Sequence, residues 1–415
     1  MNTAFWTHRT PCLGHRKGQG GLLLARAQVG LLEHYMSMAT KKKQTTAAAH
    51  DDIRAGALES FLGQMSKDKP GEVRALSDES ALRVEVIPTG VISLDVALGI
   101  GGLPKGRVTE IYGPTGGGKS TLSLAVAIQC QKLGGNVGFV DCEQALSKEL
   151  AMNMGVDPDK FVVYQPKDGE DAIDMVESML KSRAFDLVIV DSIAAMTPRA
   201  EMEADIQQQH MGLHARLMSK FMRRVYSPVS DANVVLLCLN QVRVNLQSYG
   251  APERPTGGNA VAFAASIRVE VRTSPSKKIE REGVAIGTLV TAKVLKNKLA
   301  SPYRQAEYDV IFGRGIEASG SLLAVCEQLG LVVRNGASYM DATTGERLGI
   351  GKDNVKRLLN EDKALYTRLE KAVYDTVEAN RVGGVKVEES KDDHGSDGYE
   401  SLETELVSLD DTDLS

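Results

Sequence analysis

The chain has 415 residues, a formal net charge of −5, 42% hydrophobic and 25% charged residues, as expected of a soluble protein with one large core. No run approaches the roughly 18 consecutive apolar residues of a membrane-spanning helix, so no membrane partner is expected. The five cysteines are scattered without the spacing of a metal site, which favours buried, reduced thiols and a reducing compartment.

The N-terminal segment is unusual in composition. Residues 1–32 contain no acidic residue but carry four basic ones, which resembles an organelle transit peptide. The alternative is upstream translation that the working protein does not need, because Met36 and Met38 are later possible starts. We favour a disordered or dispensable extension over residues 1–50. The expected location is then the cytoplasm. The alternative is an organelle, if residues 1–37 are a transit peptide.

Residues 51–83 are expected to form a short helix and a linker. Leu58, Phe61, Leu62 and Met65 recur at the spacing of one helix face, and two aspartates favour the helix start. This apolar stripe packs either on the chain's own core or on a neighbouring subunit. We assign the segment to subunit packing, as an oligomerisation helix.

The sequence GPTGGGKST at residues 113–121 fits the P-loop pattern G-x-x-x-x-G-K-[ST]. It lies between a β-rich run and a run with helical periodicity, the context such a loop requires. Lys119 is expected to reach the β- and γ-phosphates of a nucleoside triphosphate, and Ser120 to bind Mg²⁺. A glycine-rich turn without a ligand is the alternative. The predicted nucleotide-binding residues are Gly113, Pro114, Thr115, Gly116, Gly117, Gly118, Lys119, Ser120 and Thr121.

Apolar runs alternate with helical patterns from residue 84 to residue 317. The predicted core strands are residues 137–140, 187–190, 234–239 and 266–272. Near-continuous apolar runs indicate strands that are buried on both faces. We therefore predict an α/β fold with a mostly parallel, twisted sheet flanked by helices.

Polar residues follow three of these predicted strands, where the carboxyl ends of a parallel sheet place a ligand site. Glu143 is a candidate base for activating water, and a surface acid is an equal alternative. Asp191 ends an apolar strand as a Walker B aspartate does and would hold Mg²⁺; helix capping is its alternative. Gln241 is a candidate reader of the γ-phosphate, with a structural amide almost as probable.

The C-terminal part is expected to be a small α/β domain at residues 318–382, with a hairpin turn at 341–346 and mostly helix over 354–377. A polar, disordered tail follows at residues 383–415. Eleven acidic residues and one lysine lie in residues 388–415, which leaves 48 basic and 43 acidic residues before them. A basic body with an acidic tail suits a polyanion ligand and an electrostatic brake; a solvated tail is the simpler, compatible alternative.

Several motifs occur in an order that resembles one family. Besides the P-loop they are IPTGVISLDVALG at 87–99, AAMTPRAE at 194–201, HMGLHAR at 210–216, NQVR at 240–243, TGGNA at 256–260 and KNK at 296–298. The chain is identified on these motifs as a divergent member of the RecA family of bacterial-type DNA recombinases, over about residues 51–380. The resemblance implies a P-loop, RecA-type ATPase and DNA-binding core at residues 84–317, with ATP as the nucleotide.

The resemblance also assigns roles to individual residues. Glu143 would be the catalytic carboxylate, and Gln241 would couple the γ-phosphate to DNA binding. Phe312 would face the adenine. The implied catalytic residues are Lys119, Glu143, Gln241, Lys296 and Lys298.

Two of these lysines are implied to act between subunits. Lys296 and Lys298 would reach the ATP held by the neighbouring subunit, as arginine fingers do. Phe263 would pass the ATP signal across the interface. From the residues alone, the lysines resemble a solvated strand edge and Phe263 a core residue.

Two loops are implied to hold DNA, at residues 203–211 and 243–255. Backbone amides and arginines suit phosphates, which carry most sequence-independent affinity. The implied DNA-binding residues are Met211, Arg216, Arg223, Arg243, Leu246, Tyr249, Gly257, Gly258 and Asn259.

Three positions depart from the family pattern. Ser147 and Leu150 stand where an acid and a tyrosine usually line the adenine, so weaker adenine selectivity or ATP affinity is expected. Thr273 stands where an arginine often follows Arg272, so one DNA contact is expected to be missing.

The implied function is ATP-dependent recombination. ATP at subunit interfaces would promote a helical filament on single-stranded DNA, which pairs with homologous double-stranded DNA and exchanges strands. Stimulated self-cleavage of a LexA-type repressor, and so the SOS response, is a further implication. The alternatives are a ring ATPase and a regulatory DNA-binding filament of the same fold with little strand exchange.

Overall fold

The computed structural model describes residues 53–68, 73, 75, 84–203, 212–243 and 254–383. The chain divides into two compact units, and the boundary along the chain lies between residues 83 and 84. The first unit contains a helix at residues 53–68, which confirms the helix expected there. Its Leu58 and Phe61 are 59% and 51% exposed. The predicted N-terminal extension and acidic tail lie outside the described residues, apart from residue 383.

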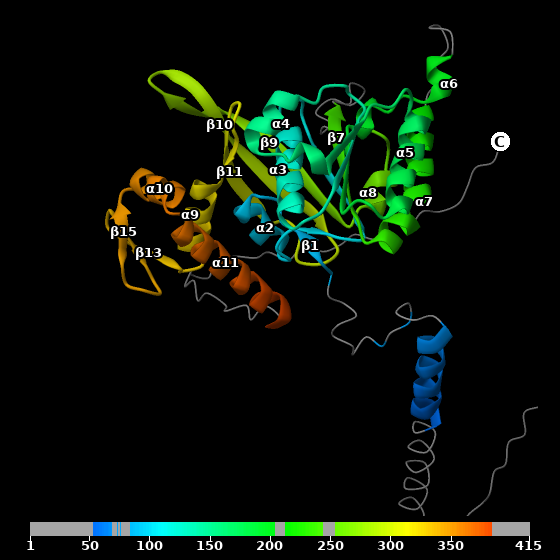
Figure 1. Ribbon diagram of the computed structural model, residues 1–415, viewed down its shortest axis with the longest axis horizontal. Coiled ribbons are helices and arrows are strands. Elements are labelled where there is room, and N and C mark those ends of the chain that lie inside the picture. The colour runs from blue at the N-terminus through cyan, green and yellow to red at the C-terminus, as the bar shows by residue number, and fades with distance from the viewer. Residues whose placement is uncertain are drawn as a thin grey trace, which may run out of the picture. The chain divides into compact units, whose positions relative to one another are not determined.

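A ten-stranded sheet forms the centre of the second unit (Figure 1). Its strand order is β12-β11-β10-β9-β3-β7-β6-β4-β5, with β8 paired to β7. The parallel strands are β3 (Arg107–Gly113), β4 (Val137–Asp141), β5 (Phe161–Tyr164), β6 (Leu187–Asp191) and β7 (Val235–Arg243), joined by the first part of β9 (Ile267–Arg281). The predicted mostly parallel α/β sheet is confirmed.

An antiparallel extension continues this sheet. Its strands are β9, β10 (Val284–Asn297), β11 (Gln305–Ile311) and β12 (Gly315–Glu317). The outer ends of β9 and β10 project from the body as a long hairpin (Figure 1). The expected strand at 266–272 therefore continues to Arg281, well beyond its predicted end.

Side chains of the inner parallel strands β4, β6 and β7 are buried on both faces, as their apolar runs predicted, whereas the edge strand β5 exposes Val162 and Val163. In β6, Leu187 and Ile189 join one core cluster and Val188 and Val190 join the other. The first cluster includes α3 (Lys119–Lys132), and the second includes α5 (Gly169–Ser182) and α7 (Leu213–Ala232). Full burial of such a side chain contributes roughly 1.5–3 kcal/mol, so the two helix layers hold the carboxyl ends of the strands at one rigid edge.

Short elements complete this part of the chain. They are β1 (Val86–Ile87), α2 (Ile92–Leu98), β2 (Leu103–Pro104), α4 (Lys148–Met154), α6 (Arg199–Met202), β8 (Arg254–Pro255) and α8 (Ala260–Ala264). Single turns of 3-10 helix lie at Pro158–Lys160 and Ile193–Ala195.

The C-terminal elements gather beside β11, away from α5 and α7 (Figure 1). They are α9 (Ala318–Gln328), β13 (Val332–Asn335), β14 (Ser338–Asp341), β15 (Arg347–Ile350), α10 (Lys352–Glu361) and α11 (Lys363–Gly383). The turn predicted at 341–346 joins β14 to β15 in a hairpin. The helix predicted over 354–377 is divided between α10 and α11 at Asp362.

A buried carboxyl joins α11 to α2. Asp95 is fully buried, and it accepts hydrogen bonds from Thr89 N at 2.8 Å and from Tyr374 Oη at 2.7 Å. Burial raises the pKa of Asp95 from 3.8 to about 7, although both hydrogen bonds oppose the rise. The folded state therefore favours the protonated carboxyl.

We expect this junction to weaken as pH rises. Because the pKa of Asp95 is higher in the folded than in the unfolded state, its contribution is complete below pH 3.8 and is lost as pH rises through about 7. From about pH 5 to about pH 8, wild type should lose a few kcal/mol of stability relative to Asp95→Asn. Denaturant unfolding of both proteins at each pH checks this, and parallel losses would contradict it.

Three of the described cysteines match the expectation of buried, reduced thiols. Cys130, Cys238 and Cys326 are buried and unpaired, and Cys142 is half-buried. Burial raises the pKa of Cys130 and Cys326 to about 12, so both remain thiols at neutral pH. None of the helices in the described ranges combines the length and apolarity that crossing a membrane needs.

Candidate active site and nucleic-acid interface

The predicted P-loop lies between β3 and α3, in the strand–loop–helix context that the motif requires. A side chain at Gly113 would place its Cβ 2.0 Å from the carbonyl oxygen of Val271 on β9, so only glycine fits there. Gly118 precedes α3 with a φ of 89°, a conformation that glycine adopts at no steric cost. The loop is thus shaped by the sheet beneath it and opens at the N-terminus of α3, where anions bind.

Lys119 turns back onto this loop. Its Nζ donates to the carbonyl oxygens of Gly113 at 3.1 Å and Pro114 at 2.8 Å. Burial lowers the pKa of Lys119, while the carboxylates of Asp191 and Glu143 oppose that effect. This ammonium thus donates to two neutral carbonyls at a helix N-terminus, and a phosphate would offer it a stronger, charge-assisted bond.

Ser120 and Asp191 come together beside Lys119. Ser120 Oγ donates to Asp191 Oδ2 at 2.7 Å, although the two residues are 71 positions apart. Burial raises the pKa of Asp191 to about 6, an effect that Ser120 reduces and Glu143 increases. These oxygens are the ligand type that Mg²⁺ takes along with nucleotide phosphates and water. In the described ranges no group of three or more His, Cys, Asp or Glu could hold a metal ion by itself.

Glu143 and Gln241 are in direct contact. Gln241 Nε2 donates to Glu143 Oε1 at 2.6 Å, and Ser192 Oγ donates to the same oxygen. Glu143 follows β4, Ser192 follows β6 and Gln241 lies on β7, so three strand ends converge on one carboxylate. Ser192 was not predicted, although its place directly after Asp191 could have suggested it.

A buried polar network underlies this edge, and the sequence did not reveal it. Asn240 donates to Glu110 Oε1 at 2.8 Å and accepts from Thr256 Oγ1 at 2.7 Å. Arg268 pairs with the other Glu110 oxygen at 2.5 Å. Asn240 Oδ1 also accepts from Gln241 N at 2.8 Å. The network ties the segment after β8 to β3, which leads into the P-loop, and to Gln241.

Of the three positions predicted to lie near the adenine, only Phe312 offers an exposed aromatic ring. Phe312 follows β11 and is 59% exposed, so its ring is available to a ligand. Ser147 instead caps α4, because its side chain accepts from Leu150 N at 3.1 Å. Leu150 is half-buried against the cluster around Leu124. Neither Ser147 nor Leu150 therefore supplies the acidic or tyrosine side chain that usually lines the adenine in the family pattern.

Lys296 and Lys298 meet the C-terminal end of α8. Lys296 Nζ donates to the carbonyl oxygens of Ala262 at 2.6 Å and Phe263 at 3.1 Å, and Lys298 Nζ reaches Phe263 O at 3.5 Å. Burial and the neighbouring cations Lys298 and Arg268 lower the pKa of Lys296. Phe263 lies on α8 and is 73% exposed rather than in the core, as a contact residue for another molecule would be.

Of the predicted DNA-binding residues within the described ranges, Arg243 and Gly257 line one cavity, whereas Arg216 and Arg223 do not line it. Arg216 and Arg223 are exposed on α7, Arg243 is exposed at the end of β7, and Gly257 begins the turn into α8. Gly258 and Asn259 complete that turn and are exposed. Met211, Leu246 and Tyr249 lie outside the described residues.

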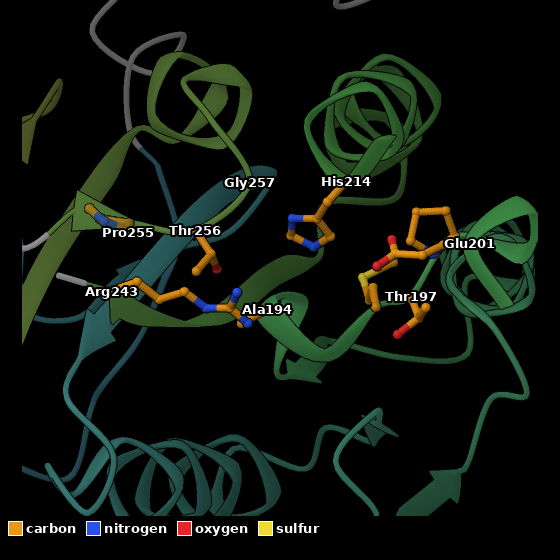
Figure 2. A pocket seen from close by; sticks show the side chains of 10 residues that line it. Ala194, Thr197, Glu201, His214, Arg243, Pro255, Thr256 and Gly257 are labelled. Atoms are coloured by element: carbon orange, nitrogen blue, oxygen red, sulfur yellow. The ribbon is translucent and has the colours of Figure 1, made fainter. Parts of the chain in front are cut away.

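A cavity of about 460 Å³ opens between the elements that flank the two predicted DNA loops (Figure 2). Figure 2 shows Arg243, His214 and Glu201 pointing into it from β7, α7 and α6. No role was predicted for His214 or Glu201, although both lie in motifs that carry the resemblance. Their spacing alone gives no sign that they share a cavity.

The comparisons with known proteins agree with this geometry. The family model of the RecA N-terminal domain matches residues 56–317, and that of the RecA C-terminal domain matches residues 320–378. The chain belongs to the RecA family. The sequence-based resemblance is thereby confirmed.

Individual RecA proteins align over most of the chain. Protein RecA of a Helicobacter pylori strain is 43% identical over 337 residues, covering 80% of this chain and 95% of its own. Protein RecA of Campylobacter jejuni subsp. doylei is 41% identical over 352 residues, covering 84% and 100%. A crystal structure of the RadB recombinase matches with 25% identity and a TM-score of 0.44, covering 56% of this chain and 98% of RadB.

Membership of the RecA family indicates the general function of the chain. Proteins of this family use ATP and work on DNA, so the chain is a RecA-family recombinase, consistent with DNA recombination and repair. The P-loop, the Glu143–Gln241 contact and the cavity at Arg243 occupy one connected region of this RecA fold.

Proposed function

We propose that the protein is a Mg²⁺- and ATP-dependent recombinase that forms a helical filament on single-stranded DNA and exchanges its strand with a homologous duplex. The observation that carries this proposal is the position of Gln241. It donates to Glu143 at the nucleotide edge, and β7 ends two residues later at Arg243, which lines the cavity between the DNA loops. A change at the γ-phosphate can therefore reach the DNA side through one short strand segment.

The proposed hydrolytic step follows from the same contacts. Lys119 leaves its two carbonyl partners to bind the β- and γ-phosphates of ATP. Ser120 and Asp191 would hold Mg²⁺, which would neutralise charge on the phosphates. When ATP binds, Gln241 exchanges its bond to Glu143 for one to the γ-phosphate, and so reports that ATP is present. Glu143 takes a proton from the water whose oxygen attacks the γ-phosphorus, and the bond from that phosphorus to ADP breaks, which releases ADP and phosphate.

Exposed apolar side chains support assembly into a filament. Phe263 is 73% exposed beside Lys296, and the helix at residues 53–68 exposes Leu58 and Phe61. Apolar side chains of this size gain free energy when a partner covers them. We propose that residues 51–83 pack on a neighbouring subunit, and that residues 84–317, 318–382 and 383–415 form the core, the C-terminal domain and the acidic tail.

The shared-site proposal predicts a loss of assembly. Lys296→Ala should bind ATP but fail to assemble cooperatively and should lose at least about 100-fold in hydrolysis, as when a charge-stabilising donor is removed. Mixing it with Glu143→Gln should restore hydrolysis if each site uses groups from two subunits. Lys293→Ala, an exposed lysine on the same strand, is the control. Normal hydrolysis by pure Lys296→Ala would contradict the proposal.

The acidic tail is proposed to compete with DNA. Its ten net negative charges in residues 388–415 act through a Debye length of roughly 8–10 Å near physiological salt. Truncation after residue 387 should speed the uptake of duplex DNA and lower the Mg²⁺ concentration needed for exchange, by about twofold or more, with a smaller effect as salt rises. Superimposable Mg²⁺ titrations of the full-length and truncated proteins would show that the tail has no such role.

DNA-stimulated hydrolysis tests the proposed function. Purified protein should hydrolyse ATP slowly alone and at least about tenfold faster with saturating single-stranded DNA, because the DNA-bound state completes the site. A rate independent of DNA would contradict the coupling proposed for Gln241. We further propose a cytoplasmic location and, where the host has one, stimulated self-cleavage of a LexA-type repressor, which adding such a repressor to the filament would test.

A further inference from the structure

The DNA-side cavity contains a histidine that the proposed function does not use. His214 is the second residue of α7, and it lines the cavity with Arg243 and Glu201 (Figure 2). It also lies opposite the turn at Gly257, which carries a predicted DNA contact. The chemistry of its ring is therefore relevant to any ligand that enters the cavity.

One ring nitrogen of His214 is already committed. Nε2 lies 2.9 Å from the carbonyl oxygen of Ile193. A carbonyl oxygen can only accept, so Nε2 must carry the hydrogen in that bond. Nδ1 is then a bare acceptor in the neutral ring and an N–H donor in the charged ring.

The Nδ1 edge of the ring faces the turn at Gly257. A Cβ atom on Gly257 would lie 3.4 Å from Cε1 and 3.6 Å from Nδ1 of His214, and 2.7 Å from Cγ of Met218. Gly257 also has a φ of 87°, in the left-handed region that favours glycine. Glycine at 257 is therefore required by the backbone conformation and by Met218, and the turn lines the same cavity as His214.

The charges around His214 are balanced while its ring is neutral. Glu201 on α6 contributes one negative charge to the cavity lining, and Arg243 on β7 contributes one positive charge. Arg199, also on α6, is paired with Asp168 at 2.9 Å. Protonation of His214 therefore changes the net charge of the lining from zero to +1.

We propose that His214 is a proton-dependent ligand for a backbone phosphate of single-stranded DNA, held in this cavity beside Arg243. This inference rests on the proposed DNA binding. The fixed Nε2 bond aims Nδ1–H of the charged ring at the ligand, and a charge-assisted bond to phosphate is stronger than a neutral one. A bound phosphate favours the protonated ring, and by linkage protonation favours binding to the same extent.

The expected result is DNA affinity that rises as pH falls. An imidazole ordinarily gains its proton between about pH 8 and pH 5. Uptake of one proton raises affinity by up to about tenfold per pH unit. We expect about tenfold tighter binding of labelled oligothymidylate at about pH 6 than at about pH 8, with an ATP analogue that is not hydrolysed. Oligothymidylate suits the test because thymine does not titrate in this range.

The variants separate His214 from other titrating groups. His214→Gln retains an N–H that can donate to Ile193 O but carries no charge, so its binding should lose most of the pH dependence. Lys220→Gln removes a fixed charge from an exposed position on α7 outside the cavity, so it should weaken binding equally at both pH values and retain the slope. Glu201→Gln should bind more tightly than wild type at about pH 8, because it leaves the lining positive without His214.

Different results of these experiments test the role of His214 and the proposed DNA binding. An equal pH slope in wild type and His214→Gln would overturn the role of His214. Unchanged affinity of Glu201→Gln at about pH 8 would overturn the placement of the phosphate in this cavity. Calorimetry in two buffers of different ionisation enthalpy should show proton uptake on binding that His214→Gln lacks. If wild type binds no oligothymidylate at any pH, the proposed DNA binding itself is wrong.

Discussion

Lys119→Ala is expected to abolish ATP hydrolysis and every ATP-dependent step while the fold remains intact. Lys119 Nζ is held by Gly113 O and Pro114 O, which places it at the N-terminus of α3 where phosphates would bind. Removing it deletes the one side-chain cation of the P-loop. We expect ATP affinity to fall by roughly 10–100-fold, the worth of a charge-assisted bond, and hydrolysis by at least about 10²–10³-fold.

The measurements are equilibrium binding of a fluorescent ATP analogue and steady-state hydrolysis with single-stranded DNA. Lys132→Ala is the matched control, because Lys132 is an exposed lysine at the opposite end of the same helix. Circular dichroism should show that both variants are folded. Wild-type nucleotide affinity in Lys119→Ala would mean that the P-loop does not bind the phosphates.

Glu143→Gln is expected to separate ATP binding from hydrolysis. The amide keeps an oxygen that can accept from Gln241 and Ser192, so the contacts at the strand ends should survive. It cannot take a proton from water, and loss of a general base costs about 10²–10⁴-fold in rate. Affinity for ATP should remain within about twofold of wild type, and the complex with single-stranded DNA should last longer because only hydrolysis is blocked.

Single-turnover hydrolysis and dissociation from labelled DNA provide the readout. Glu149→Gln is the control, since Glu149 is an exposed carboxylate in the first turn of α4. If Glu143→Gln hydrolyses ATP at the wild-type rate, another group activates the water. If it loses ATP binding as well, Glu143 acts mainly in holding the site together.

The sequence predicted which side chains lie together where one physical rule governs their placement. Apolar runs identified parallel strands, and the carboxyl ends of parallel strands meet at one edge. Glu143 and Gln241 are 98 positions apart, and their strand ends made each a candidate, beside the alternatives of a surface acid and a structural amide; the structure places the two side chains 2.6 Å apart. Ser120 and Asp191 follow the same rule.

Features that depend on strand register were not predictable from one sequence. Glu110 and Arg268 form a buried ion pair because β3 and β9 run in parallel with these residues opposite each other. The same pairing places Val271 O against Gly113. The strand predicted at 266–272 ends too early. Ser274 and Pro275, which follow Thr273, resemble strand breakers, but they lie at an irregularity in the pairing of β9 with β10, where proline is tolerated.

Other features depend on how helices approach one another. His214 and Glu201 share a cavity only because α6 and α7 both border the end of β7. Asp95 and Tyr374 are 279 positions apart, and their contact requires α11 to return to α2. No periodicity within either segment contains that information.

Three-strand exchange with purified protein tests the central claim most directly. Circular single-stranded DNA, a homologous linear duplex, ATP and Mg²⁺ are mixed, and joint molecules and nicked circular product are followed on a gel. We expect product with the homologous duplex, none with a heterologous duplex, and none with Lys119→Ala. Tight DNA binding and ATP hydrolysis without joint molecules would contradict the claim and favour a regulatory filament or a ring ATPase of the same fold.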